Sequence, residues 1–316
     1  MDLRTCFQPD LDELRGISLC AGYAGLDLGL HIAEPQYRTV AFVERESHAA
    51  AALVARMADQ ALGQAAIWDD LRTFDGRPFR DRVHLVSAGY PCQPFSYAGR
   101  RTGETDPRHL WPEVARIVDE VRPRWVWCEN VEGHLSLGFP DVISSLRGMG
   151  YSTKAGLFTA REAGARHRRR RLFILAHADS QRWRLRSGPD DRSGPYPVGF
   201  SGGHHERERG AVCSERVDEG VDVALVDAEG GGLVGDVGEL PLFAPGPGEL
   251  QAWEGILATR PDAQPAVLRT DDGVADWMDR TRGAGNGVCS LAAARAWAVL
   301  KAAHVLDARG SVDHLS

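Results

Sequence analysis

Cysteine is scarce in this sequence, and no two cysteines stand at the spacing of a metal or redox motif. The chain has six cysteines in 316 residues and no Cys-x-x-Cys pair, which argues against a zinc site and against a disulfide framework. No apolar run approaches the ~18 residues of a membrane-spanning helix, and the first residues lack a signal-peptide pattern. We therefore expect a reduced, cytoplasmic protein with no metal ion and no membrane segment.

Net positive charge is also missing. The formal net charge is -7, which argues against a polycation that coats nucleic acid. Arginines nevertheless crowd residues 161–171, whereas acidic residues dominate residues 215–279. Such a local basic patch can still meet phosphate groups, although most charge runs are solvated faces with counter-ions nearby.

The first half of the chain alternates short apolar runs with helical patterns, which predicts an α/β fold with a Rossmann-like, mostly parallel sheet. Ser47 is the expected N-cap of the second helix. The expected strands are 16–20, 39–43, 83–88, 125–128 and 171–176, and the expected helices are 26–32, 47–57, 110–121 and 141–149.

The amino-acid composition changes after Asp179. Residues 180–250 are rich in Gly, Ser, Arg, Asp and Pro, with one strand candidate at 221–226. This composition favours disorder, and a small recognition insert is the alternative. A helix is expected at 291–300, with alanine at most of its solvent-facing positions.

Cys92 is the most informative residue of the chain. It lies in Gly-Tyr-Pro-Cys-Gln-Pro-Phe-Ser (89–96), directly after the apolar strand 83–88. Flanking prolines stiffen the turn, so the thiol is held where a strand leaves the sheet, which suits a nucleophile. The alternative is a small buried apolar residue, which is what a free cysteine usually is.

Two motifs precede Cys92. The segment Ala21–Gly25 follows the first expected strand, and glycines there allow close backbone approach to a ligand beside a helix N-terminus. Glu44 ends the second strand, where an acid can bind ribose hydroxyls. Asp70 could accept from an adenine amino group. Plain turns are the alternatives for the glycines and for Asp70.

Three motifs follow Cys92. Glu129 and Asn130 end the strand at 125–128, where ligands bind a parallel sheet, and burial there would let a carboxyl donate a proton near neutral pH. In an extended run, Arg169 and Arg171 share one face and Arg168 and Arg170 the other. Gly285-Asn286-Gly287-Val288 predicts a tight loop against a ligand, with a helix-capping turn as the alternative.

Taken in this order, the motifs resemble the DNA cytosine-5 methyltransferase family over residues 16–179 and about 252–303. The combination of Pro91-Cys92-Gln93 with Glu129-Asn130-Val131 and the arginine strand carries the resemblance. It implies a catalytic S-adenosylmethionine-binding domain at 1–179, a variable target-recognition segment at 180–251, and a part at 252–316 that returns to the catalytic domain.

The resemblance also implies a role for each residue. Cys92 would attack C6 of a flipped-out cytosine, Glu129 would hydrogen-bond or protonate N3, Arg169 would contact the base carbonyl, and Arg171 would brace the site. Base or DNA contacts are expected from Gln93, Ser96, Asn130 and Arg168. S-adenosyl-L-methionine would lie along Cys20, Ala21, Gly22, Tyr23, Gly25, Leu26, Glu44, Arg45, Asp70, Leu71 and Pro91, with Asn286 and Val288 closing over it.

The expected partner is double-stranded DNA, bound by a monomer in a bacterial host cytoplasm. The expected biological setting is a restriction-modification system, with or without a partner nuclease, or a phage or prophage that protects its DNA. An RNA cytosine-5 methyltransferase, an enzyme with an altered cofactor, and a catalytically silent nucleic-acid-binding relative are the alternatives. Three segments depart from the family pattern: Ser18-Leu19-Cys20, Arg166-His167 and Cys289-Ser290-Leu291.

Overall fold

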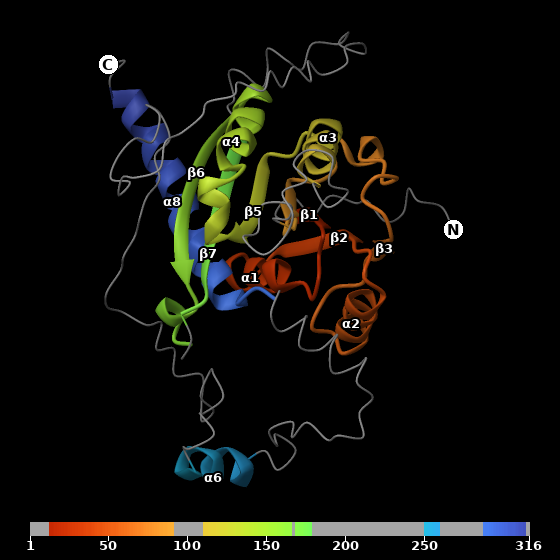
Figure 1. The fold of residues 1–316 in the computed structure, drawn as a ribbon, viewed down its shortest axis with the longest axis vertical. Coiled ribbons are helices and arrows are strands. Elements are labelled where there is room, and N and C mark those ends of the chain that lie inside the picture. The colour runs from red at the N-terminus through yellow and green to blue at the C-terminus, as the bar shows by residue number, and fades with distance from the viewer. Residues whose placement is uncertain (1–12, 92–109, 166–167, 179–249, 260–286, 314–316) are drawn as a thin grey trace, which may run out of the picture.

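The computed structural model describes residues 13–91, 110–165, 168–178, 250–259 and 287–313, with side chains described as far as residue 306. Figure 1 shows a central sheet with helices on both faces. The predicted α/β class with a mostly parallel, Rossmann-like sheet is confirmed. No helix among the described residues is long and apolar enough to cross a membrane.

Seven strands form the sheet in the order β3-β2-β1-β4-β5-β7-β6. The pairs that involve β7, with β5 and with β6, are antiparallel, and the other described pairs are parallel. The chain reverses its direction of strand addition between β1 and β4, and ligands of such sheets bind at the carboxyl ends of the strands at this point. The strands are β1 (Leu14–Leu19), β2 (Tyr37–Val43), β3 (Ala66–Trp68), β4 (Leu85–Ala88), β5 (Trp125–Val131), β6 (Tyr151–Thr159) and β7 (Arg170–Ala178).

Helices cover both faces because alternate strand residues point to opposite sides. On β4, Leu85 packs with α1 and α8, whereas Val86 packs with α3 and α4. The helices are α1 (Gly25–Ala33), α2 (Ser47–Ala58), α3 (Trp111–Val121), α4 (Phe139–Gly148), α6 (Leu250–Thr259) and α8 (Ser290–Asp313), with 3-10 turns η1 (Arg77–Phe79), η3 (Glu132–Ser136) and η4 (Arg161–Ala163).

The helix α8 brings residues from the end of the chain back onto the sheet (Figure 1). Its indole Trp297 Nε1 donates to Glu34 Oε1 over 2.7 Å, and Lys301 pairs with the same carboxylate. The expectation that alanines of this helix face solvent is wrong. Ala293 and Ala296 are buried at 1% and 0% exposure, because Gly29 of α1 lets the two helices approach closely.

One local expectation is wrong, and two strands were missed. Ser47 is not the N-cap of α2: the cap residue is Glu46, and its backbone N–H donates to the Glu44 carboxylate over 2.7 Å. Strands β3 and β6 are present in the structure but were not predicted from the sequence. The strand candidate at 221–226 lies outside the described residues.

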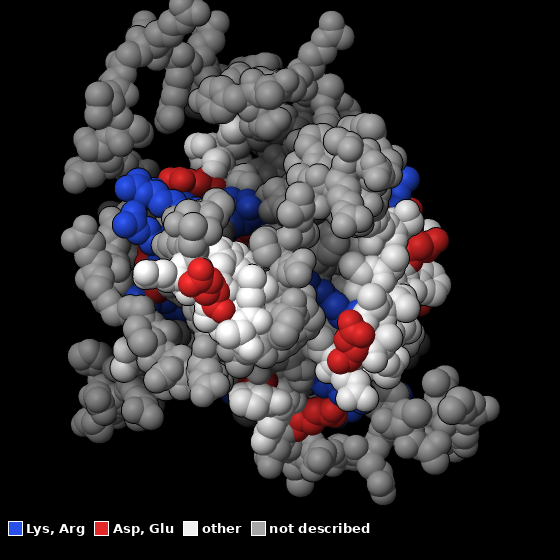
Figure 2. Space-filling view, turned by 90° about the horizontal axis from the view of Figure 1, so that it is seen from below, with Lys and Arg blue, Asp and Glu red and all other residues white. Residues whose placement is uncertain are grey.

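The described surface carries charges of both signs. On the face drawn in Figure 2, Lys and Arg side chains stand among Asp and Glu side chains. Some of the exposed charges of the described part form ion pairs, for example Arg170 with Glu132 at 2.8 Å. Pairs of this kind stabilise the fold little, since water screens them.

Candidate active site

The loop after β1 and the loop after β4 meet at the point where the sheet order reverses. The backbone N–H of Gly89 donates to the Leu19 carbonyl over 3.2 Å. A Cβ placed on Gly89 would lie 3.5 Å from the Cys20 carbonyl oxygen and 3.9 Å from Glu129 Oε2. The glycine loop, the segment before Cys92 and the end of β5 therefore share one small region.

The glycine loop after β1 is shaped by unusual backbone angles. Cys20, Gly22 and Ala24 have φ values of 50°, 53° and 55°, in the left-handed region. A Cβ placed on Gly22 would meet no described atom within 4 Å, so the space above this residue is open. A Cβ on Gly25 would lie 2.8 Å from the Val288 carbonyl oxygen, so the loop before α8 closes against the start of α1.

Glu44 ties this loop to the start of α2. Its Oε2 accepts from the Gly22 N–H over 2.6 Å, and its Oε1 accepts from the Glu46 N–H over 2.7 Å. Each carboxylate oxygen can accept more than one hydrogen bond. Glu44 is therefore both a support of the loop and an acceptor at the carboxyl end of β2.

The other residues expected at the cofactor have mixed surroundings. Asp70 Oδ1 accepts from the Arg72 N–H over 3.0 Å, which is the turn-capping geometry raised as the alternative for this residue. Leu26 and Leu71 are buried, and Arg45 and Pro91 are exposed. The ring of Tyr23 meets His48 edge-on. Asn286 lies outside the described residues.

Glu129 is the central titratable group of the region. It is 7% exposed at the end of β5, and Arg171 Nε lies 3.0 Å from its Oε1. Burial raises the pKa of this carboxyl to about 7, against the opposing effect of Arg171 and then of Arg169. A carboxyl with this pKa can both hold and release a proton at neutral pH.

Arg169 lies just before β7, with a φ of 35°. Its Nη2 donates to the Gly287 carbonyl, which joins the arginine segment to the loop before α8. Burial and the neighbouring Arg171 lower the pKa of this guanidinium. Exposure alternates along the segment: Arg168 and Arg170 are exposed, and Arg169 and Arg171 are half-buried. Of the half-buried pair, Arg171 contacts Glu129 directly, and Arg169 lowers the pKa of Glu129 through its charge.

The segment before Cys92 is held by side chains that the sequence did not single out. Tyr90 is buried, its hydroxyl lies 3.0 Å from His134 Nε2, and its ring packs on Trp111 with centroids 5.4 Å apart. Burial lowers the pKa of His134 to about 4, so this imidazole is neutral at pH 7. The one sequence feature that could have pointed to Tyr90 is its position two residues before Cys92.

Asn130 has different surroundings from those expected of a base contact. It is 4% exposed, its Nδ2 donates to the Tyr90 carbonyl over 3.2 Å, and its Oδ1 accepts from the Val131 N–H over 2.8 Å. The side chain thus supports the backbone that leads to Cys92.

Two of the described cysteines, Cys20 and Cys128, differ from an activated thiol. Burial raises the pKa of Cys128 to about 12, and burial together with Glu44 raises that of Cys20 to about 12, so both stay protonated. Cys92, Gln93 and Ser96 lie outside the described residues. No group of three or more His, Cys, Asp or Glu side chains in the described part is arranged to hold a metal ion.

The family model of the C-5 cytosine-specific DNA methylases matches residues 14–200, more than half of the chain. The chain belongs to this family. The match covers the sheet strands β1 to β7, the glycine loop and both members of the Glu129–Arg171 pair. The family predicted from the motifs is confirmed.

Individual methylases of this family align over the same half. Type II methyltransferase M.CviJI of Paramecium bursaria Chlorella virus IL3A is 34% identical over 169 residues, which are 52% of this chain and 43% of that protein. Type II methyltransferase M.NgoMIV of Neisseria gonorrhoeae is 32% identical over 168 residues, 52% of each chain. The chain thus spans about half the length of these curated relatives.

A solved structure, that of S. pombe Dnmt2 methyltransferase, aligns with 52% of this chain and 51% of its own. The sequence identity is 22% and the TM-score is 0.44.

Proposed function

We propose that this methylase family member transfers a methyl group to C5 of cytosine in a specific sequence of duplex DNA. The observation that supports this proposal most directly is the buried Glu129 carboxyl, which pairs with Arg171 at 3.0 Å beside the open glycine loop. A carboxyl with a pKa of about 7 suits a group that must share a proton with a ring nitrogen of the base.

The described residues fit S-adenosyl-L-methionine as the methyl donor. Open space above Gly22 admits a ligand against the backbone, and the carboxylate of Glu44 is available at the adjacent strand end to accept from hydroxyl groups. Asp70 and Leu71 follow β3, the strand that neighbours β2 in the sheet. The bound donor supplies the methyl group that C5 receives.

The chemistry assigned to Cys92 follows from its place in the motif. Its thiolate adds to C6 of a cytosine turned out of the duplex, which makes C5 a carbon nucleophile. Glu129 shares its proton with N3 and so disperses the charge that this addition creates. Arg169 binds the base carbonyl, and Arg171 holds Glu129. After C5 is methylated, loss of the C5 proton restores the double bond and releases Cys92.

The decisive experiment is covalent trapping on duplex DNA that carries 5-fluorocytosine, in the presence of the methyl donor. Fluorine at C5 cannot leave as a proton does, so the adduct between Cys92 and C6 persists. We expect a stable complex with the wild-type chain and none with Cys92→Ala. A folded, donor-bound protein that forms no adduct would favour a silent DNA-binding protein.

The substrate class is tested by comparing duplex DNA with transfer RNA. We expect methyl transfer to DNA. Bisulfite sequencing of DNA from bacterial cells that express the chain would then report the target. A methylated RNA and an unmethylated DNA would instead support the RNA-modifying alternative.

We assign target recognition to residues 180–251, in a monomer that acts in the bacterial cytoplasm. Exchanging this segment for that of a relative should change the methylated sequence and leave the chemistry intact. Light scattering of the purified chain reports its oligomeric state. Protection of host DNA from a nuclease would support a restriction-modification or phage-protection role.

A further inference from the structure

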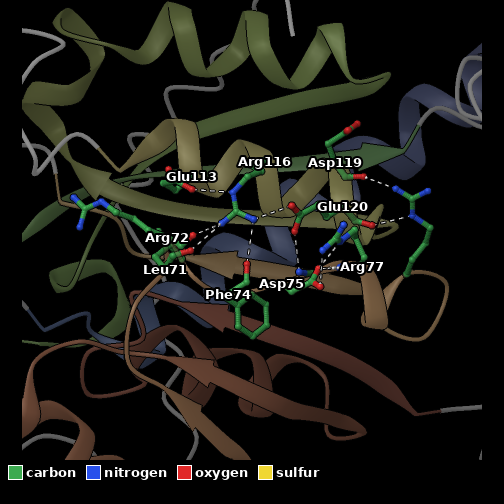
Figure 3. Close-up of polar contacts among 11 residues, drawn as sticks. Leu71, Arg72, Phe74, Asp75, Arg77, Glu113, Arg116, Asp119 and Glu120 are labelled. Atoms are coloured by element: carbon green, nitrogen blue, oxygen red, sulfur yellow. Dashed lines mark hydrogen bonds and ion pairs between the residues drawn. The ribbon is translucent and has the colours of Figure 1, made fainter. Parts of the chain in front are cut away.

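Arg116, in the middle of α3, binds a segment of chain more than 40 residues away. Its Nη2 donates to the Leu71 carbonyl over 2.9 Å, and its Nη1 donates to the Phe74 carbonyl over 3.1 Å. Figure 3 shows the guanidinium between these carbonyl groups and the acids of its own helix. With a longer contact to the Arg72 carbonyl at 3.5 Å, one side chain thus ties α3 to three carbonyl groups of the segment that follows β3.

Two glutamates orient this guanidinium. Glu113 accepts from Arg116 Nε over 2.8 Å, and Glu120 accepts from Arg116 Nη1 over 2.8 Å. The second oxygen of Glu120 accepts from the Gly76 N–H, also over 2.8 Å. These side chains are 21–31% exposed, so their ion pairing stabilises the fold little. The fixed, planar fork of donors matters more than the charge, because it defines where the carbonyls lie.

The segment held in this way depends on α3 for its position. It follows β3, which has only three residues at the edge of the sheet. Within the segment, the Asp70 carbonyl accepts from the Thr73 N–H over 3.1 Å, and Leu71 and Phe74 are buried at 5% exposure each. Short hydrogen bonds within a turn shape it locally, whereas Arg116 and Glu120 fix it against the rest of the protein.

The same helix also contacts the segment that leads to the nucleophile. Trp111, the first residue of α3, packs on Tyr90, and Tyr90 precedes Cys92 by two residues. One rigid element therefore contacts the backbone after β3 and the backbone after β4. Trp111 makes the contact with Tyr90, whereas Arg116 binds the segment after β3, so replacing Arg116 should affect that segment first.

We propose that Arg116 is a positioning residue of the methyl-donor site. It does not touch the donor; it holds the backbone of Leu71, and with it Asp70, at the place where the adenosine part of the donor binds. This inference rests on the proposed function, because it takes Asp70 and Leu71 as donor-binding residues. Its consequence is that Arg116 controls the affinity for the donor more than the rate of the bound complex.

The test is the dissociation constant of S-adenosylhomocysteine, measured by calorimetry on the full chain. Arg116→Met removes every donor of the fork and should raise this constant about tenfold or more, which corresponds to roughly 1.4 kcal/mol. Arg116→Lys keeps the charge without the fork and should raise it less. With saturating donor, kcat should stay within about threefold of wild type, because a loss of donor affinity alone leaves the chemical step of the bound complex unchanged.

Arg77→Ala is the matched control. Arg77 belongs to the same stretch of chain, but its side chain is 73% exposed and pairs only locally with Asp75 in the contacts described, at 2.8 Å. We expect an unchanged dissociation constant. Hydrogen exchange of the apo chain gives a second readout: backbone amides 72–76 should exchange faster in Arg116→Met than in Arg77→Ala.

Failure of the inference is distinguishable from failure of the proposed function. A wild-type chain that does not bind S-adenosylhomocysteine would contradict the proposed function itself. A wild type that binds it, with Arg116→Met binding equally well below its unfolding temperature, would overturn the role of Arg116. If Arg116→Met does not fold, Glu120→Gln replaces it, and an unchanged constant in both Glu120→Gln and Arg116→Lys would overturn the inference as well.

Discussion

Arg171 Nε lies 3.0 Å from Glu129 Oε1 although the two residues are 42 positions apart in the chain. The antiparallel pairing of β5 with β7 sets Glu129 opposite Phe173 and Val131 opposite Arg171. Glu129 and Arg171 are thus diagonal neighbours on one face of the sheet, within reach of long side chains. The register of two strands, and no local motif, creates this pair.

Replacing Glu129 should impair chemistry more than DNA binding. Glu129→Gln keeps the shape but removes the exchangeable carboxyl proton, and removal of a general acid typically lowers the rate by about 10²–10⁴-fold. We expect kcat to fall by at least about a hundredfold in a tritium-transfer assay, with DNA affinity near wild type. Glu132→Gln is the control, because Glu132 directly follows the same strand and its pair with Arg170 is exposed. An equal loss in both variants would contradict the role of Glu129.

Activity should fall as the pH rises through about 7. The proposed donor form of Glu129 is the protonated one, and its fraction decreases above the pKa. Because kcat/KM reports the free enzyme, its descending limb should lie near this value. The same limb must be absent from Glu129→Gln, which has no proton to lose; a limb that persists in that variant would assign the titration to another group.

The raised pKa of Glu129 also predicts a pH-dependent stability. The unfolded carboxyl ionises near 4.5 and the folded one near 7, so between these values the folded state holds more protons. Stability from this group therefore falls as the pH rises across that window, by on the order of 3 kcal/mol in total. Denaturant unfolding of the wild type and of Glu129→Gln at pH 4 and pH 8 measures it. The wild type should lose more stability than the variant; a constant difference would contradict the assigned pKa.

Asn130→Ala separates a supporting role from a base contact. The substitution removes the hydrogen bond to the Tyr90 carbonyl, which lies two residues before Cys92. We expect kcat to fall while the KM for DNA changes little, and the free energy of unfolding to fall by about 1–3 kcal/mol. A large rise in KM for DNA, with kcat preserved, would instead support the predicted contact of Asn130 with the base.

Gly29→Ala tests the close approach of α1 and α8. A Cβ at this position would lie 2.7 Å from Ala293 Cβ and 2.7 Å from the Ser290 carbonyl oxygen. Overpacking of this kind costs about 1–3 kcal/mol, which thermal unfolding would report. Gly148→Ala is the matched control, because a Cβ there meets no described atom within 4 Å. Equal stability of the two variants would show that the helices can move apart freely.

The sequence predicted the sheet core well and its edges poorly. Continuous apolar runs reveal buried parallel strands, and β1, β2, β4 and β5 were found in this way. β3 is only three residues long, and β6 mixes Ser, Thr, Lys and Gly with apolar residues. Neither pattern distinguishes an edge strand from a loop, so both were missed.

The residues that support the site could not be predicted from the sequence for a related reason. Periodicity says which face of an element a residue lies on, but not which residue of another element it meets. Nothing local connects Tyr90 with His134, Arg116 with the Leu71 carbonyl, or Glu44 with the Gly22 N–H. Each of these contacts closes a long stretch of chain and exists only in the folded state.

What the sequence determined by itself is the order of the chemical motifs and hence the family, because each motif is local and its spacing is written in the chain. The tertiary structure decided how those motifs meet. The reversal of strand order between β1 and β4 brings the glycine loop, the backbone before Cys92 and Glu129 together at the carboxyl ends of the central strands. Burial at this place raises the pKa of Glu129 to about 7, since desolvation of a carboxyl depends on packing from all sides.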